Sequence, residues 1–282
     1  MTYGEVYHKG KSILAEAKNE SPAFDAACLL QKVFGLDRQA LILRSAEAAE
    51  EAQAAEYFRM VGERASGRPL QYILGRWPFL ELELQVGEGV LIPREETELL
   101  VRTAADYLQN SASPNVVDLC AGTGAVALGL ASLLPKVRVT AAELYEEAFH
   151  YLVLNQKETG FPNVTPVRLD VLNPESAERF SGLDGVVSNP PYVKAEEIPS
   201  LQTEVRREPR TALAGGTDGL DFYRAIAQYW LPKLKRGGFA AVEVGEGQAP
   251  EVKRLFEAAG LSQIRFHTDF NGIERVVSGI YC

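Results

Sequence analysis

The stretch DLCAGTGAVALGLA, residues 118–131, joins the end of an apolar segment to a run of small and aliphatic residues that is typical of a helix. The apolar segment is NVVDL, residues 115–119, which has the length and composition of a buried strand. Gly122 and Gly124 allow a sharp turn from strand to helix, and a backbone without Cβ lets a ligand approach closely. A strand, a glycine turn and a helix in this order predict an open sheet that binds a ligand at the turn.

Six further apolar runs follow along the chain, and they are VRVTAAE, VTPVRL, GVVSN, GFAAVEVG, SQIRFH and RVVSGIY. Helix-prone segments separate most of them, which predicts a mostly parallel sheet with helices on both faces. Only TDFNG separates the last two runs, so we expect the last strand to be antiparallel.

The first part of the chain has a different pattern. Residues 1–74 place apolar residues at helical spacing and include the helix-prone stretch AEAAEEAQAAEYFRMVGERA, which predicts a small helical bundle. Residues 75–93 are predicted to form a β-hairpin linker, with FLELELQV as one strand, GEG as the turn and VLIPR as the partner strand. The predicted fold class is α/β: a Rossmann-like, seven-stranded, mostly parallel sheet in residues 94–282, with a helical bundle and a hairpin before it.

Composition excludes several classes of protein. The chain has 282 residues, of which 46% are hydrophobic and 24% charged, which argues against disorder. No apolar stretch is long enough to span a bilayer, and the N-terminus does not resemble a signal peptide, so we expect a cytoplasmic protein with no membrane partner. The three cysteines and three histidines form no metal-binding motif, so no metal is expected. A net charge of −9 argues against direct binding of nucleic acid.

Two acidic residues end the strands that follow the glycine turn. Glu143 ends TAAE, nineteen positions beyond Gly124. An acid at this place in a doubly wound sheet can accept hydrogen bonds from the hydroxyl groups of a ribose. Asp170 ends VRLD, where it can accept a hydrogen bond from an adenine amino group or cap a turn. These residues indicate an adenosine-containing ligand. Ala127 stands where the dinucleotide fingerprint has its third glycine, so NAD is not favoured.

The fourth strand of the predicted series ends in SNPPY, residues 188–192. Two successive prolines end a strand and fix the direction of their carbonyl groups. The side-chain oxygen of Asn189 and the carbonyl of Pro190 can accept both hydrogens of a planar NH₂ group, which lets the nitrogen become pyramidal and face a methyl donor. Tyr192 can stack on the acceptor and favour a nearby sulfonium. Methyl transfer to such a nitrogen needs no general base at this loop. The alternative interpretation of SNPPY is a rigid turn with a purely structural role.

These motifs together resemble class I S-adenosylmethionine-dependent methyltransferases with an (Asn/Asp)-Pro-Pro-Tyr loop, and more narrowly the release factor glutamine methyltransferases of the PrmC or HemK family. The resemblance covers nearly the whole chain and is carried by GRPLQYILG (67–75), LIPREETELLV (91–101), DLCAGTGAVALGLA, SNPPYV and EPRTALAGGTDGLDFYR (208–224). It implies a protein-(glutamine-N5) methyltransferase whose cofactor is S-adenosyl-L-methionine. The implied substrate is the glutamine side chain in the Gly-Gly-Gln motif of class-1 peptide-chain release factors, which act in translation termination.

The resemblance also implies roles for domains and residues. Residues 1–74 would recognise the substrate, and residues 94–282 would form the catalytic domain that binds S-adenosylmethionine. The cofactor would contact Cys120, Ala121, Gly122, Thr123, Gly124, Glu143, Asp170, Val171 and Asn189. The glutamine would be held by Asn189, Pro190, Pro191 and Tyr192, of which Asn189, Pro190 and Tyr192 would be catalytic.

The sequence departs from the family pattern at two places. Cys120 and Ala121 stand where relatives often have glycine and a small polar residue, so we expect a tighter turn. Val171 replaces an aromatic residue that some relatives have after the acid, so we expect less stacking on adenine.

Two other functions use the same motifs. An adenine-N6 DNA methyltransferase handles a planar NH₂ group with the same loop, but it needs a basic face to grip phosphates. Residues 1–75 carry nine Lys and Arg against ten Asp and Glu, a net charge of 9 − 10 = −1. A non-catalytic scaffold that binds S-adenosylmethionine would not need Asn189 and Tyr192.

The loop EVRREPRTALAGG, residues 204–216, either lines the acceptor groove or packs on the sheet.

Overall fold

The computed structural model describes residues 1–282, and the chain divides into two compact units. One unit combines Met1–Arg76 with the short segment Gln202–Arg207, and the other combines Trp77–Leu201 with Glu208–Cys282. None of the helices is both long enough and apolar enough to cross a bilayer.

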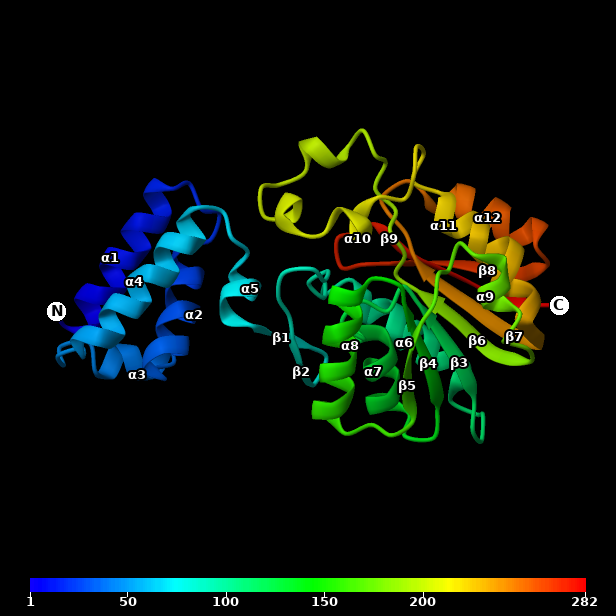
Figure 1. The fold of residues 1–282 in the computed structure, drawn as a ribbon, viewed down its shortest axis with the longest axis horizontal. Helices are drawn as coiled ribbons and strands as arrows, with labels where there is room; N and C mark the ends of the chain where they lie inside the picture. The colour runs from blue at the N-terminus through cyan, green and yellow to red at the C-terminus, as the bar shows by residue number, and fades with distance from the viewer. The chain divides into compact units, whose positions relative to one another are not determined.

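The first unit is a bundle in which α1, α2 and α4 pack against one another (Figure 1). Its helices are α1 (Tyr3–Glu16), α2 (Pro22–Phe34), α3 (Arg38–Leu43), α4 (Glu51–Ala65), α5 (Leu70–Leu74) and the 3₁₀ turn η2 (Val205–Arg207). Thr2 and Glu5 form a capping box at the start of α1, and α2 begins at Pro22, the position that proline favours. This confirms the predicted N-terminal helical bundle.

A buried arginine joins the two segments of this unit. Arg64 donates from Nε to Asp25 Oδ2 at 2.6 Å and from Nη2 to Glu204 Oε1 at 2.8 Å. Burial lowers the pKa of Arg64, but its hydrogen bonds to Glu204 and Asp25 raise the pKa by more. The guanidinium therefore stays charged, and it holds the segment Gln202–Arg207 on the bundle.

The hairpin after the bundle is shorter than predicted and lies earlier in the chain. Its strands are β1 (Arg76–Phe79) and β2 (Leu82–Gln85), and Leu80 turns the chain between them with a φ of 51°. The prediction that VLIPR, residues 90–94, is the partner strand was wrong. The N–H of Ile92 donates to the Glu208 carboxylate at 3.0 Å, so this segment bonds to a side chain.

The second unit is built on a seven-stranded sheet with the order β5-β4-β3-β6-β7-β9-β8. Its strands are β3 (Asn115–Leu119), β4 (Arg138–Glu143), β5 (Val164–Arg168), β6 (Leu183–Ser188), β7 (Leu234–Glu243), β8 (Leu261–Thr268) and β9 (Glu274–Tyr281). β3 to β7 pair in parallel, whereas β9 runs antiparallel to both of its neighbours. The seven predicted strands and the antiparallel last strand are thereby confirmed.

Helices cover both faces of this sheet (Figure 1). They are α6 (Thr97–Leu108), α7 (Ala125–Leu133), α8 (Glu146–Thr159), α9 (Pro174–Ala177), α10 (Arg210–Leu213), α11 (Asp221–Ala225) and α12 (Ala249–Ala258), with 3₁₀ turns η1 (Ile198–Ser200) and η4 (Leu231–Lys233) and the π-helix η3 (Ile226–Trp230). Two apolar clusters form the core. One includes residues of α6, α7 and α8, and the other includes residues of α11, η3 and α12.

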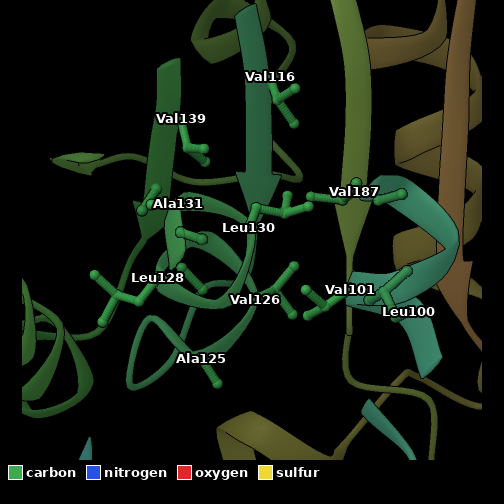
Figure 2. Close-up of a cluster of buried hydrophobic side chains, with 14 of the residues drawn as sticks. Leu100, Val101, Val116, Ala125, Val126, Leu128, Leu130, Ala131, Val139 and Val187 are labelled. Atoms are coloured by element: carbon green, nitrogen blue, oxygen red, sulfur yellow. The ribbon is translucent and has the colours of Figure 1, made fainter. Parts of the chain in front are cut away.

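The helix that follows the glycine turn is buried on nearly all sides. Figure 2 shows Val126 and Leu130 of α7 close to Val101 of α6 and Val187 of β6. Because seven consecutive residues of α7, from Ala125 to Ala131, are buried, the helix is fixed in position. The glycine turn at its N-terminus is consequently held against the sheet.

Candidate active site

A cavity in the second unit lies at the carboxyl ends of β3, β4, β5 and β6. The strand order changes direction between β3 and β6, and ligands of open α/β sheets bind at such a point. Of the predicted site residues, the cavity is lined by Cys120, Ala121, Gly122, Thr123, Glu143, Asp170, Val171, Asn189 and Pro191. Gly124, Pro190 and Tyr192 lie beside these residues in the chain but do not line the cavity.

Three residues with positive φ shape the turn after β3. Cys120, Gly122 and Gly124 have φ values of 60°, 54° and 85°. The φ of 85° at Gly124 favours glycine, and an added Cβ would lie 2.7 Å from Cδ1 of Leu152, which would have to move. A Cβ at Gly122 would have only Val90 Cγ2 near it, at 3.9 Å, and would take up space in the cavity that Gly122 lines. This turn therefore leaves room for a ligand against its backbone.

Asp118 is a buried acid next to the glycine turn, and sequence analysis gave it no role. Asp118 Oδ2 accepts the N–H of Ala127 in the first turn of α7 at 3.0 Å, while Oδ1 has no partner. Burial raises the pKa of Asp118 well above its usual value, and the nearby Glu143 raises it further. Asp118 ties the strand to the helix on the two sides of the glycine turn.

Glu143 is held by three backbone N–H groups at the tip of β4. Its Oε2 accepts from Gly122 at 2.9 Å, and its Oε1 accepts from Leu144 at 2.8 Å and from Tyr145 at 2.9 Å. Burial raises the pKa of Glu143, and these N–H groups oppose that rise. At the tip of β5, Asp170 accepts the N–H of Leu172 at 2.9 Å. Both acids line the cavity, and backbone hydrogen bonds fix their directions.

Asn189, at the start of the Asn-Pro-Pro-Tyr loop, is bonded to Thr97 and through it is linked to Glu243, and sequence reasoning missed both of these residues. Its Nδ2 donates to Thr97 Oγ1 at 3.1 Å, and the Thr97 hydroxyl donates to Glu243 Oε2 at 2.6 Å. Thr97 is the first residue of α6, within the segment LIPREETELLV, and Glu243 ends β7. Thr97 and Glu243 are almost fully buried, at 3% exposure each; Thr97 lines the cavity together with Asn189, whereas Glu243 does not line it.

Neighbouring segments hold the rest of the loop. The N–H of Val193 donates to the carbonyl of Leu213 at 2.8 Å, and Gln248 Nε2 donates to the carbonyl of Tyr192 at 3.1 Å. Burial raises the pKa of Tyr192 to about 12, so its phenol stays neutral. A Cβ at Gly215 would lie 2.7 Å from the carbonyl oxygen of Pro191. The Asn-Pro-Pro-Tyr loop is therefore packed on both sides.

Two further segments complete the cavity wall, one of which was predicted to be a hairpin strand and the other to be either a groove lining or a structural loop. One supplies Leu91, Pro93 and Arg94. The other is the loop after Glu208, and it supplies Pro209, Thr211 and Ala212. Glu208 forms an ion pair with Arg94 and joins the two segments. Burial raises the pKa of Glu208, and the positive charge of Arg94 opposes that rise.

The cavity suits an adenosyl ligand with a reactive group at one end. At one side it has a glycine turn and two oriented acids, with Leu144, Tyr145 and Leu172 as apolar surface between them. At the other side Asn189 offers a polar amide next to stiff prolines. This arrangement brings oriented carboxylates and a polar amide into one cavity, as transfer between two bound molecules would require.

Comparison with known proteins agrees with this geometry. Residues 5–75 match the family model described as PrmC N-terminal domain, and residues 95–217 match the one described as Methyltransferase small domain. A T. thermophilus 16S rRNA N2 G1207 methyltransferase, solved in complex with AdoMet and guanosine, matches with a TM-score of 0.52 at 16% identity, over 73% of this chain and 50% of that one. At this identity the likeness shows the fold alone.

Curated relatives are similar over nearly their whole length. A release factor glutamine methyltransferase of Clostridium acetobutylicum is 35% identical over 96% of this chain and 96% of its own. One of Gloeobacter violaceus is 39% identical over 94% of this chain and 93% of its own. With the matching family models and the similarity over nearly the full length in agreement, the chain belongs to the release factor glutamine methyltransferase family.

Proposed function

We propose that this protein transfers a methyl group from S-adenosyl-L-methionine to the side-chain amide nitrogen of the glutamine in the Gly-Gly-Gln motif of class-1 peptide-chain release factors. Membership of the family supports the reaction. The observation that carries the proposal is that Asn189 lines the same cavity as the glycine turn and Glu143.

The cofactor would be held by the residues that shape one side of the cavity. Glu143 presents a carboxylate to the ribose hydroxyls, and Asp170 presents one to the adenine amino group. Gly122 and its neighbours Cys120, Ala121, Thr123 and Gly124 form a turn against which the methionine part lies, and Val171 adds apolar contact. When bound, S-adenosylmethionine supplies a methyl group on a positively charged sulfur.

The residues of the Asn-Pro-Pro-Tyr loop activate the acceptor. Asn189 Oδ1 and the carbonyl of Pro190 each accept one hydrogen of the glutamine amide, which holds the nitrogen in place and frees its lone pair from the planar amide. Pro191 keeps the carbonyl direction stiff, and Tyr192 favours the positive charge of the donor. The neutral phenol of Tyr192 takes no proton, consistent with a reaction that has no general base at the loop.

A division of labour between the parts of the chain follows from this proposal. Residues 1–74 would recognise the release factor away from the glutamine, residues 75–93 would link, and residues 94–282 would carry out catalysis. The substrate is a protein of translation termination, so the enzyme would act in the cytoplasm. It would need no metal, membrane or nucleic acid as a direct partner.

The acceptor test separates this function from its alternatives. The protein is incubated with S-adenosylmethionine labelled in the methyl group and, in parallel, with a class-1 release factor, its Gln→Ala variant in the Gly-Gly-Gln motif, and duplex DNA. We expect label in the release factor alone. Label in DNA would indicate the adenine-N6 methyltransferase, equal label in the Gln→Ala variant would refute the glutamine as acceptor, and binding of the donor without label anywhere would indicate a scaffold.

A further inference from the structure

The hydrogen bonds behind Asn189 form a chain whose direction matters. Asn189 Nδ2 bonds to Thr97 Oγ1 at 3.1 Å, and Thr97 Oγ1 bonds to Glu243 Oε2 at 2.6 Å. A threonine hydroxyl has one proton to donate and two lone pairs with which to accept. When Glu243 is ionised it can only accept, so Thr97 gives its proton to Glu243 and must accept from Asn189.

That constraint selects one orientation of the Asn189 amide. Asn189 has to turn its NH₂ group toward Thr97, and its oxygen then lies on the other branch of the planar amide. Only the oxygen can accept a hydrogen from the substrate amide. A flipped Asn189 would place two hydrogens against the hydrogens of the substrate and would lose the interaction that the proposed function assigns to Oδ1.

We propose that Thr97 and Glu243 are positioning residues, and that ionised Glu243 acts through the Thr97 hydroxyl to keep Asn189 Oδ1 available to the substrate amide. This inference rests on the proposed function for its catalytic consequence. The orientation itself depends only on the hydrogen bonds within the protein.

Protonation of Glu243 would release the constraint. A protonated Glu243 can donate to Thr97, whose own proton is then free to be donated to Asn189, so both amide orientations become possible. Burial raises the pKa of Glu243 to about 7, and the hydrogen bond from Thr97 opposes this rise. Glu96 raises the pKa as well, Arg275 and Arg94 lower it, and the phenol of Tyr192 also lies near. The hydroxyl of Tyr223 bonds to the Glu243 backbone carbonyl, so it does not compete for the carboxylate.

The direction in which turnover depends on pH therefore follows from the ionisation of Glu243. Because Glu243 is deprotonated above its pKa, turnover should rise with pH as this residue ionises. Because the productive orientation stays possible when Glu243 is protonated, a single ionisation near pH 7 gives an increase in kcat of at most about tenfold between about pH 6 and about pH 8. Glu243→Gln does not titrate, and its amide can donate to Thr97 as well as accept from it, so like protonated Glu243 it leaves both orientations of Asn189 possible. We expect this variant to lose the pH dependence and to keep the lower kcat of the protonated form at all pH values.

The decisive experiment combines kinetics with an NMR signal of the Asn189 side chain. kcat is measured against pH with the release factor for wild type, Thr97→Val, Thr97→Ser, Glu243→Gln and the control Thr103→Val, which changes a buried threonine of α6 that does not line the cavity. We expect Thr97→Val to lower kcat at pH 8 by about tenfold or more with donor KM little changed. Thr97→Ser should restore kcat, and Thr103→Val should leave it near wild type.

The ¹⁵NH₂ resonances of the Asn189 side chain, identified by their loss in Asn189→Ala, report the orientation without any substrate. They should shift with pH with a midpoint near 7 in wild type and stay constant in Glu243→Gln. Unchanged kcat in Thr97→Val, or an Asn189 signal that titrates equally in Glu243→Gln, would contradict the positioning role of Thr97 and Glu243. Absence of methylation by the wild type would contradict the proposed function, and the NMR titration would still test whether Glu243 sets the orientation of Asn189. Thermal unfolding of each variant identifies any that fails to fold.

Discussion

At the scale of single residues, glycines decide whether the Asn-Pro-Pro-Tyr loop can take its position. A Cβ at Gly215 would lie 2.7 Å from the carbonyl oxygen of Pro191 and 2.8 Å from Cα of Tyr192. Both atoms belong to the backbone of the loop, so no side-chain rotation can make room. Gly215, the first glycine of the pair in ALAGG, therefore packs directly against the backbone of the Asn-Pro-Pro-Tyr loop.

Gly215→Ala should displace the Asn-Pro-Pro-Tyr loop. We expect a loss of about 1–3 kcal/mol in the free energy of unfolding from overpacking, together with a lower kcat for methyl transfer. Gly62→Ala is the matched control, since Gly62 lies exposed in α4 with nothing within 4 Å of an added Cβ, and alanine favours a helix. Chemical denaturation and methyl-transfer assays check both variants. Equal stability and activity of Gly215→Ala and wild type would contradict this account of the loop.

At the scale of elements, the sequence predicted what its own periodicity encodes. The seven strands follow from apolar runs separated by helix-prone segments, and the antiparallel last strand follows from a short connection. The hairpin was misplaced because VLIPR has strand composition, yet the fold uses its Ile92 N–H to bind the Glu208 side chain, 116 positions away. Local pattern contains no information about such a distant partner.

The same argument applies to the short segment that joins the helical bundle. Arg64 and Asp25 come from α4 and α2, and Glu204 comes from Gln202–Arg207. Breaking a buried ion pair by removing one partner typically costs about 3–5 kcal/mol, because the remaining charge stays buried. Arg64→Met should therefore destabilise the first unit, and hydrogen exchange in α2 and α4 should become faster.

Arg59→Met provides the control for this prediction. Arg59 lies in the same helix, but its partners Glu56 and Glu63 are on the surface, where ion pairs contribute little. Its hydrogen exchange should match that of wild type. The double variant Asp25→Leu with Arg64→Met should recover part of the lost protection, since the buried carboxylate of Asp25 is removed and the remaining partner Glu204 is 33% exposed. Equal exchange in the Arg59 and Arg64 variants would show that the buried pair does not hold this unit together.

At the scale of the whole molecule, sheet topology turns separate motifs into one site. Gly122, Glu143 and Asn189 were expected to meet because each follows the carboxyl end of a parallel strand, and all three line the cavity. Thr97 and Glu243 were not expected, because they lie 146 positions apart and only folding brings the start of α6 to the end of β7. Strand-end rules thus predict Gly122, Glu143 and Asn189 in the cavity wall, but they do not predict Thr97, which begins a helix and lines the same cavity, or its hydrogen bond to Glu243.

The central claim is that Asn189 orients the acceptor amide and is not needed for holding the donor. The most direct measurement is the turnover of Asn189→Ala with a class-1 release factor at saturating S-adenosylmethionine, with donor binding followed by calorimetry on the same preparation. We predict a fall in kcat of about a hundredfold or more, the usual scale for loss of an oriented polar group, with donor affinity changed by less than about threefold. Turnover close to that of wild type, with the donor bound normally, would contradict the account.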